Sequence, residues 1–96
     1  MIYNICPGII MLKVCDTHLL VAKRELWKNF PRVRPIPRKH ALIWFLMEKG
    51  RNSEEVMLAF SELFNKSIDD IHQQFDPVLN QLAEEGYLIP VENNHK

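Results

Sequence analysis

Hydrophobic residues have strand-like spacing in the first part of this chain and helical spacing in the rest. The first third holds two short apolar runs, at residues 9–14 and 18–23, separated by Cys15-Asp16-Thr17. Runs of this length, rich in β-branched and large apolar residues and parted by a short polar loop, are typical of a β-hairpin. We therefore predict two antiparallel strands joined by a three-residue loop.

Proline spacing marks the next segment. After a polar connection at residues 24–30, prolines stand at positions 31, 35 and 37. Proline fixes φ and removes a backbone donor, so we predict that residues 33–37 form an extended edge strand that completes a three-stranded meander. Residues two apart in a strand direct their backbone groups to the same side. Pro35 and Pro37 therefore both leave one edge, inner or outer, without a donor.

The rest of the chain has helical spacing. Residues 41–47 are apolar without a break and end near Gly50, which predicts a buried helix too short to span a bilayer, since a span needs about 20 residues. Asn52 and Glu55 have the spacing of a capping box for a second helix. That helix carries an apolar stripe at the spacing of one helix face: Val56, Ala59, Phe60, Leu63 and Phe64.

Ser67 caps a third predicted helix whose apolar face continues until Gly86. Pro77 interrupts this helix, which either bends there or restarts with Asp76 as a new cap. The periodicity passes through Pro77 in phase, so we favour one kinked helix. Residues 87–91 then form an apolar segment that we expect to pack back on the domain.

Three strands followed by three helices predict an α+β fold of winged helix-turn-helix type. We expect a single domain over residues 1–91, large enough to fold without disulfides or metals, and a disordered tail at residues 92–96. Cys6 and Cys15 are too few for a disulfide scaffold. With no signal-peptide pattern either, the expected location is the cytoplasm.

Charge is divided unequally between the two parts of the chain. Residues 1–51 carry ten basic and three acidic side chains, whereas residues 52–96 carry two basic and nine acidic ones. Such a dipole can orient a charged partner, either an acidic peptide or a phosphate backbone. It is equally compatible with a solvated surface that complements the acidic helices of the protein itself.

Motifs for catalysis are missing from the sequence. The histidines have no partner at a metal-ligand spacing, and Asp69, Asp70 and His72 fall in the first turn of a helix, where carboxylates usually cap. The glycines form no phosphate loop, and the cysteines have no neighbouring base. We therefore expect no catalytic residue, no metal and no cofactor. An edge strand beside the third helix instead makes a groove for an extended peptide.

Several residues in order and spacing resemble the PqqD-type small proteins, which are named for pyrroloquinoline-quinone biosynthesis. The matching residues are Ile43-Trp44, Gly50, Glu54-Glu55-Val56, Leu82 and Gly86-Tyr87-Leu88. The resemblance covers residues 9–89, nearly the whole chain. The sequence departs from the family where a Leu-Asn usually ends the third strand, because Ile36-Pro37 stands there.

The resemblance implies a non-catalytic recognition element for ribosomally made, post-translationally modified peptides, a class of natural products. Such a protein holds the leader of a precursor peptide and presents it to a modifying enzyme, often a radical S-adenosylmethionine protein. The leader adds to the third strand and packs against the third helix. Carried onto this chain, the implied peptide-binding residues are Arg32, Val33, Arg34, Pro35 and Ile36 on the strand, and Gln74, Phe75, Val78 and Leu79 on the helix.

Two other functions remain open. A winged-helix nucleic-acid binder would place basic residues on phosphates: Arg24, Lys28, Arg32, Arg34, Arg38 and Lys39. The acidic residues of the third helix disfavour that reading, because this helix would enter the groove. The chain could also be a small dimerisation domain, since an open strand edge can pair with a second copy. We expect a monomer or a weak homodimer.

Overall fold

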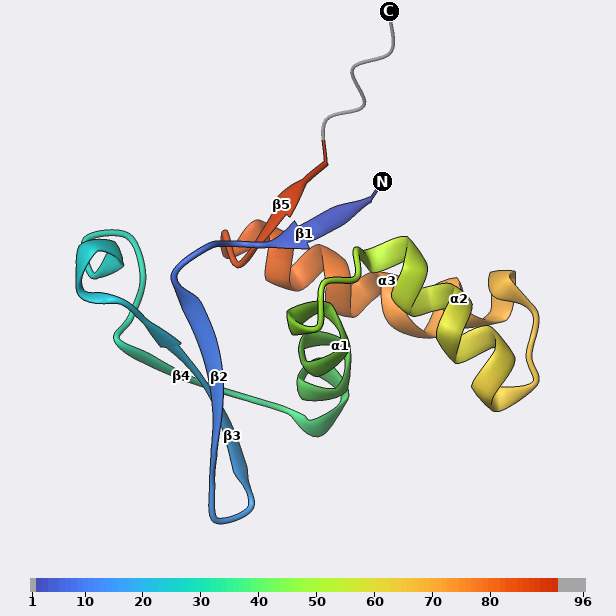
Figure 1. Cartoon of the computed structure of the whole chain (residues 1–96), viewed down its shortest axis with the longest axis horizontal. Helices are drawn as coiled ribbons and strands as arrows, with labels where there is room; N and C mark the ends of the chain where they lie inside the picture. Colours follow the sequence, from blue (N-terminus) through green and yellow to red (C-terminus); the bar gives the residue numbers. More distant parts are fainter. Residues whose placement is uncertain (1, 92–96) are drawn as a thin grey trace, which may run out of the picture.

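The computed structural model describes residues 2–91, so the tail predicted at residues 92–96 lies outside the described residues. The elements are β1 (Tyr3–Ile5), β2 (Ile9–Val14), β3 (Thr17–Ala22), the 3₁₀ turn η1 (Arg24–Leu26), β4 (Val33–Ile36), α1 (Arg38–Glu48), α2 (Ser53–Phe64), α3 (Ile68–Glu84) and β5 (Leu88–Pro90). Strands β2, β3 and β4 form an antiparallel sheet, followed by three helices (Figure 1). This arrangement confirms the predicted α+β fold.

The tip of the β2–β3 hairpin projects beyond the helices (Figure 1). Its loop is one residue shorter than predicted, because Thr17 pairs with Val14 and joins β3. The remaining loop residues are Cys15 and Asp16, and Cys15 has a left-handed backbone with φ 55°. A two-residue hairpin turn needs such a backbone to follow the twist of the strands.

The sequence did not predict the second sheet, which consists of β1 and β5. Tyr3 pairs with Pro90 and Ile5 with Leu88, and the Cys6 N–H donates to the Tyr87 carbonyl at 2.9 Å. Residues 88–90 therefore do pack back on the domain, as a strand. A three-residue strand such as β1 carries too little periodicity to be recognised from sequence.

Helix ends follow the predicted capping residues. Asn52 Oδ1 accepts from the Glu55 N–H at 2.9 Å, and Glu55 Oε1 accepts from the Asn52 N–H at 2.9 Å, which completes the capping box of α2. Ser67 Oγ accepts from the Asp70 N–H at 3.2 Å. α3 is one helix that runs through Pro77, as the in-phase periodicity predicted, and not two helices.

The core joins the helices to the inner face of the β2-β3-β4 sheet. Trp44 is fully buried, and its ring meets the Tyr87 ring edge-on, with the centroids 6.5 Å apart. The Phe60 and Phe75 rings join α2 to α3, 4.9 Å apart. From the sheet, the buried side chains are Ile9, Leu20, Ala22 and Ile36. The other face of this sheet stays apolar and half exposed: Ile10, Leu12, Val14 and Val33.

Replacing Trp44 with alanine should cost about 3–5 kcal/mol of unfolding free energy, because the change leaves a large cavity. Urea denaturation followed by circular dichroism would measure the loss. Leu42→Ala on the same helix is the control, since Leu42 is 40% exposed and its loss should cost about 1 kcal/mol or less. A Trp44→Ala protein as stable as the control would show that Trp44 is not the centre of the core.

Candidate functional site

The edge of β4 is available for another strand. In the order β2-β3-β4, β4 pairs with β3 on one side and with no strand of residues 2–91 on the other. The register places Val33 opposite Val21, Arg34 opposite Leu20, and Ile36 opposite His18. β4 is also short, with four residues, so any added strand has few partners.

Backbone direction alternates along β4, and one hydrogen bond fixes its phase. The Ala22 N–H donates to the Arg32 carbonyl at 3.1 Å, so the backbone of residue 32 faces β3. In an antiparallel pair every second residue faces the partner, and residues 34 and 36 do the same. The backbone groups of Val33 and Pro35 therefore face outward, and Pro37, just past the strand, has the same parity.

The nitrogens of Pro35 and Pro37, which carry no hydrogen, therefore face the outer edge of β4. The sequence alone did not show whether they face the inner or the outer edge. Within β4, Val33 offers one outward N–H and one outward carbonyl, whereas Pro35 offers a carbonyl alone. An added peptide would therefore donate more hydrogen bonds to this edge than it accepts. Two prolines beside a single donor also make the edge a poor partner for a second copy of itself.

The opposite edge of the sheet is closed by α1. The Met11 N–H points away from β3 and donates to Glu48 Oε2 at 3.0 Å. The same carboxylate oxygen accepts from Trp44 Nε1 at 3.0 Å, which ties this edge to the core helix. Because Glu48 occupies the central outward donor of β2, β4 is the edge better placed to accept a strand.

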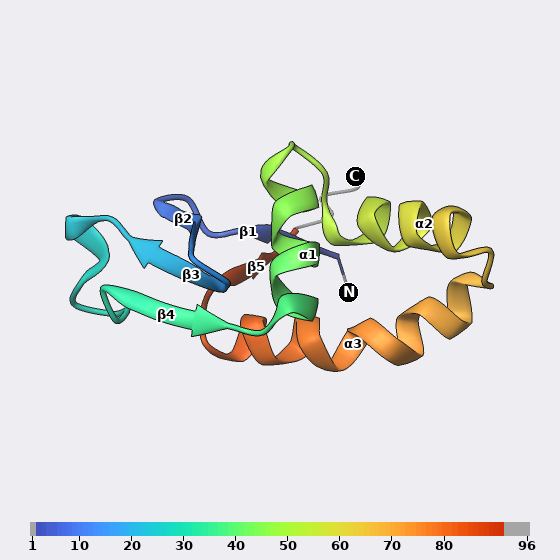
Figure 2. The ribbon, with the colours of Figure 1, turned by 90° about the horizontal axis from the view of Figure 1, so that it is seen from below.

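The C-terminal part of α3 flanks β4. Arg34 donates through Nε to Glu85 Oε1 and through Nη2 to Glu85 Oε2, the latter at 2.7 Å. One turn earlier, Gln81 Oε1 lies 2.9 Å from His40 Nε2 at the start of α1. Figure 2 shows β4 and this end of α3 along the same side of the molecule. The ion pair therefore connects this end of α3 to β4, and the amide contact connects it to α1.

Arg34 also covers part of the edge itself. Its Nη1 donates to the outward carbonyl of Pro35 at 2.9 Å. The guanidinium lies over the Tyr87 ring, 6.0 Å from the centroid. Burial raises the pKa of the Tyr87 hydroxyl, an effect that the positive charge of Arg34 partly opposes. A peptide strand that pairs with Pro35 must take the place of this Nη1 contact.

The strand residues named from the sequence have different surroundings. Arg32 is exposed and its guanidinium lies 3.9 Å from the centre of the Trp27 ring. Val33 is 49% exposed on the outer face of the sheet, whereas Ile36 is buried in the core. The backbone of this segment can reach an added strand, but among its side chains Ile36 cannot contact one directly.

The helix residues named from the sequence lie earlier in α3 than Gln81 and Glu85, which contact α1 and β4. Phe75 packs against Phe60 and has the Lys39 ammonium 5.0 Å from its ring centre, and Gln74 is exposed. Val78 is buried. Leu79 lines a small hollow of about 100 Å³ with Tyr3, His72, Asp76 and Asn80, on the β1 side of α3.

Sequence reasoning missed Gln81, Glu85 and His40, the side chains that link α3 to β4 and α1. The sequence showed Glu84 and Glu85 only as acidic residues of the third helix that disfavour nucleic-acid binding. No local signal connects Glu85 to Arg34, which lies 51 residues away. Gly86 has φ 89° and turns the chain toward β5, so it fixes where α3 stops.

The basic side chains are not gathered into one phosphate-binding surface. Arg24 and Arg32 both lie on Trp27, and Arg34 is paired with Glu85. The first turn of α3 exposes Asp69 and Asp70, which would repel phosphates. This arrangement does not favour the nucleic-acid reading.

His72 pairs with carboxylates other than the two considered from the sequence. Its Nδ1 lies 2.8 Å from Asp76 Oδ1 and its Nε2 lies 3.3 Å from Glu54 Oε1. The hydrogen bond to Asp76 is the main cause that raises the pKa of His72. Across residues 2–91, no group of three His, Cys, Asp or Glu side chains is arranged to hold a metal ion. Within the same residues, no helix is long and apolar enough to cross a membrane.

Comparison with known proteins gives one informative match. No family model matches the chain, and no curated protein matches it. Among solved structures, the chain is similar to "TbiB1 in Complex with the TbiA(beta) Leader Peptide", with a TM-score of 0.67 and 17% sequence identity. The match covers 94% of this chain and 99% of that one. The two chains therefore share one fold over nearly their whole length.

Proposed function

We propose that this chain is a non-catalytic recognition element of the PqqD type, which binds the leader segment of a ribosomally made precursor peptide. The leader adds as a strand to the outer edge of β4, beside α3. The observation that carries the proposal is the outward backbone of Val33 and Pro35, at an open edge in the fold of a protein solved with a leader peptide.

The backbone defines what a leader must offer. Opposite Val33, the peptide donates one N–H and presents one carbonyl, and near Pro35 it donates a further N–H. At most three backbone hydrogen bonds form along this edge, so side-chain contacts with α3 must supply much of the affinity and the specificity. A proline in the leader at either of these donor positions would remove a bond.

The bound leader is then presented to a modifying enzyme, such as a radical S-adenosylmethionine protein, in the cytoplasm. Cys6 and Cys15 are free thiols, which suits a reducing compartment. A small protein that holds one segment of a peptide leaves the rest of it accessible to an enzyme.

Val33→Pro tests strand addition at the single outward donor of β4. The inward ladder to β3 is kept because the Val33 N–H does not contribute to it. We expect the affinity for the leader of the nearest encoded precursor peptide to fall by about tenfold, because the change removes a hydrogen bond and restricts the backbone of the edge strand. Isothermal titration calorimetry would measure this affinity.

The controls for this variant separate the backbone from the side chain and from folding. Val33→Ala shortens the side chain and keeps the donor, so it should bind within about threefold of the parent protein. Circular dichroism would confirm that Val33→Pro is folded. A folded Val33→Pro protein with unchanged affinity would contradict strand addition at β4.

Arg34→Glu tests the charge at the groove. The change breaks the pair with Glu85 and puts two carboxylates beside β4, which should weaken the binding of an acidic leader by about tenfold. Arg51→Glu makes the same change of charge at an exposed site on the α1–α2 connection, and we expect little effect. Equal affinities for the two variants, measured by fluorescence anisotropy, would remove Arg34 from the binding site.

A further inference from the structure

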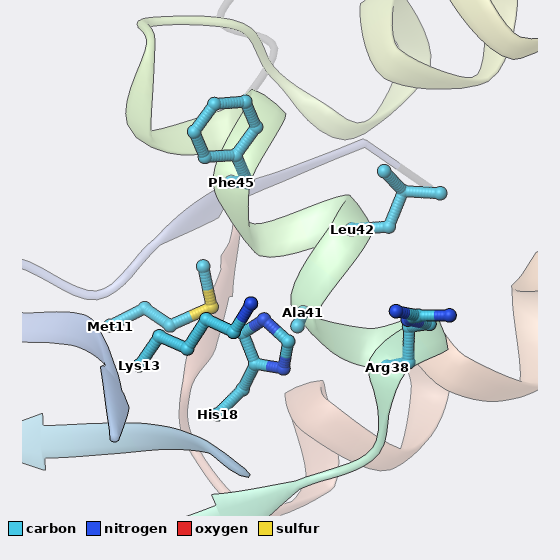
Figure 3. A pocket seen from close by; sticks show the side chains of 7 residues that line it. All are labelled: Met11, Lys13, His18, Arg38, Ala41, Leu42 and Phe45. Atoms are coloured by element: carbon cyan, nitrogen blue, oxygen red, sulfur yellow. The ribbon is translucent and has the colours of Figure 1, made fainter. Parts of the chain in front are cut away.

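Two adjoining hollows lie between the β2–β3 hairpin and the start of α1. The first has a volume of about 300 Å³ and is shown in Figure 3. The second, of about 340 Å³, lies between the hairpin tip and the connection from β4 to α1. Lys13, His18 and Arg38 line both of them, so the two hollows form one depression, which we call the hairpin cleft.

The hairpin cleft combines an apolar wall with a basic rim. Met11, Lys13 and His18 project from the hairpin into the space beside α1 (Figure 3). On α1, Leu42 and Phe45 line the cleft and are 40% and 48% exposed. Such a surface suits an apolar side chain that is followed closely by a hydrogen-bonding or charged group.

The charges at the cleft are mostly unpaired. Lys13 and Arg38 are exposed, and neither belongs to an ion pair among residues 2–91. The imidazole ring of His18 can also donate a hydrogen bond to a carboxylate. Asp16, at the hairpin tip, is the acidic side chain that lines the second hollow. The complementary ligand therefore carries a negative charge near Lys13 and Arg38.

The hairpin cleft continues from the end of β4. Ile36 and Pro37, which directly follow Pro35 at the open edge, line the second hollow. The strand order places Lys13 and His18 on the β3 side of β4, so a chain that pairs with the outer edge and extends past Pro35 reaches them across the β4–α1 connection at Pro37. No residue of α3 lines either hollow, so the cleft is separate from the space between β4 and α3.

We propose that the hairpin cleft binds the part of the leader peptide that flanks its β4-paired strand, with an apolar side chain against Met11 and Phe45 and a carboxylate at Lys13 and Arg38. This inference rests on the proposed function, because it takes the occupant to be a continuation of the same peptide. The flank gives a second specificity determinant, in addition to the short backbone pairing at Val33.

Selection of short peptides from a displayed random library tests this proposal without knowledge of the natural precursor. The protein and its Lys13→Glu/Arg38→Glu variant are each panned. Peptides enriched on the parent protein should carry Asp or Glu beside an apolar residue, on one flank of the segment that protects the Val33 amide from hydrogen exchange. The variant should bind these peptides about five- to tenfold more weakly.

Lys28→Glu/Arg51→Glu is the matched control, because it changes the net charge equally at two exposed positions that do not line the cleft. Its affinity for the selected peptides should stay within about twofold of the parent value. Phe45→Ser, which leaves the charges intact, should weaken the full peptides by a similar factor to the charge variant. None of these changes should affect peptides that lack the flank.

The outcomes separate the two proposals. If the selected peptides protect the Val33 amide but bind the parent, cleft and control proteins equally well, the cleft proposal is wrong and strand addition stands. If no selected peptide protects the Val33 amide, the proposed function itself fails. Peptides that shift the signals of Lys13 and Phe45 without protecting Val33 would make the cleft an independent site and contradict its role as a continuation of β4.

Discussion

The alternation of backbone direction along β4 is the constraint on which the site depends. Because the Ala22 N–H bonds to the Arg32 carbonyl, Arg34 and Ile36 must also face β3, and Pro35 lies where its missing N–H costs no ladder bond. A shift of one residue would put Pro35 inside the ladder and turn Ile36 out of the core. Core packing and proline chemistry thus agree on one register, and that register leaves Val33 as the outward donor.

The two edges of the β2-β3-β4 sheet are covered by different side chains. Glu48 occupies the Met11 donor of β2 and also accepts from Trp44, so the residue that closes one edge is held by the centre of the core. At β4 the covering group is Arg34, whose partners Glu85 and the Pro35 carbonyl are at the surface and easily exchanged. Both covering side chains lie near the surface, since Glu48 is exposed and Arg34 is half-buried. An ion pair near the surface, such as Arg34–Glu85, contributes about 1 kcal/mol or less.

The sequence predicted the elements that depend on local chemistry. The capping residues Asn52 and Ser67, the proline-bound edge strand and the continuous α3 all follow from residues close together in the chain. The apolar run at Ile9–Val14 could not show which face is buried, because both faces of β2 are apolar. The β1–β5 pair and the Arg34–Glu85 contact join segments that are distant in the sequence, so no local sequence pattern predicts them. For the same reason, the sequence did not indicate that Glu85 at the end of α3 contacts β4.

Hydrogen exchange of the β4 amides, followed by NMR with and without a bound leader peptide, tests the central claim most directly. In the free protein, the account predicts that the Val33 amide exchanges rapidly while the Arg34 amide, bonded to β3, is protected. Addition of the peptide should protect Val33 and leave Arg34 unchanged. A Val33 amide that stays unprotected in a saturated complex, or that is already protected in the free protein, would contradict the account.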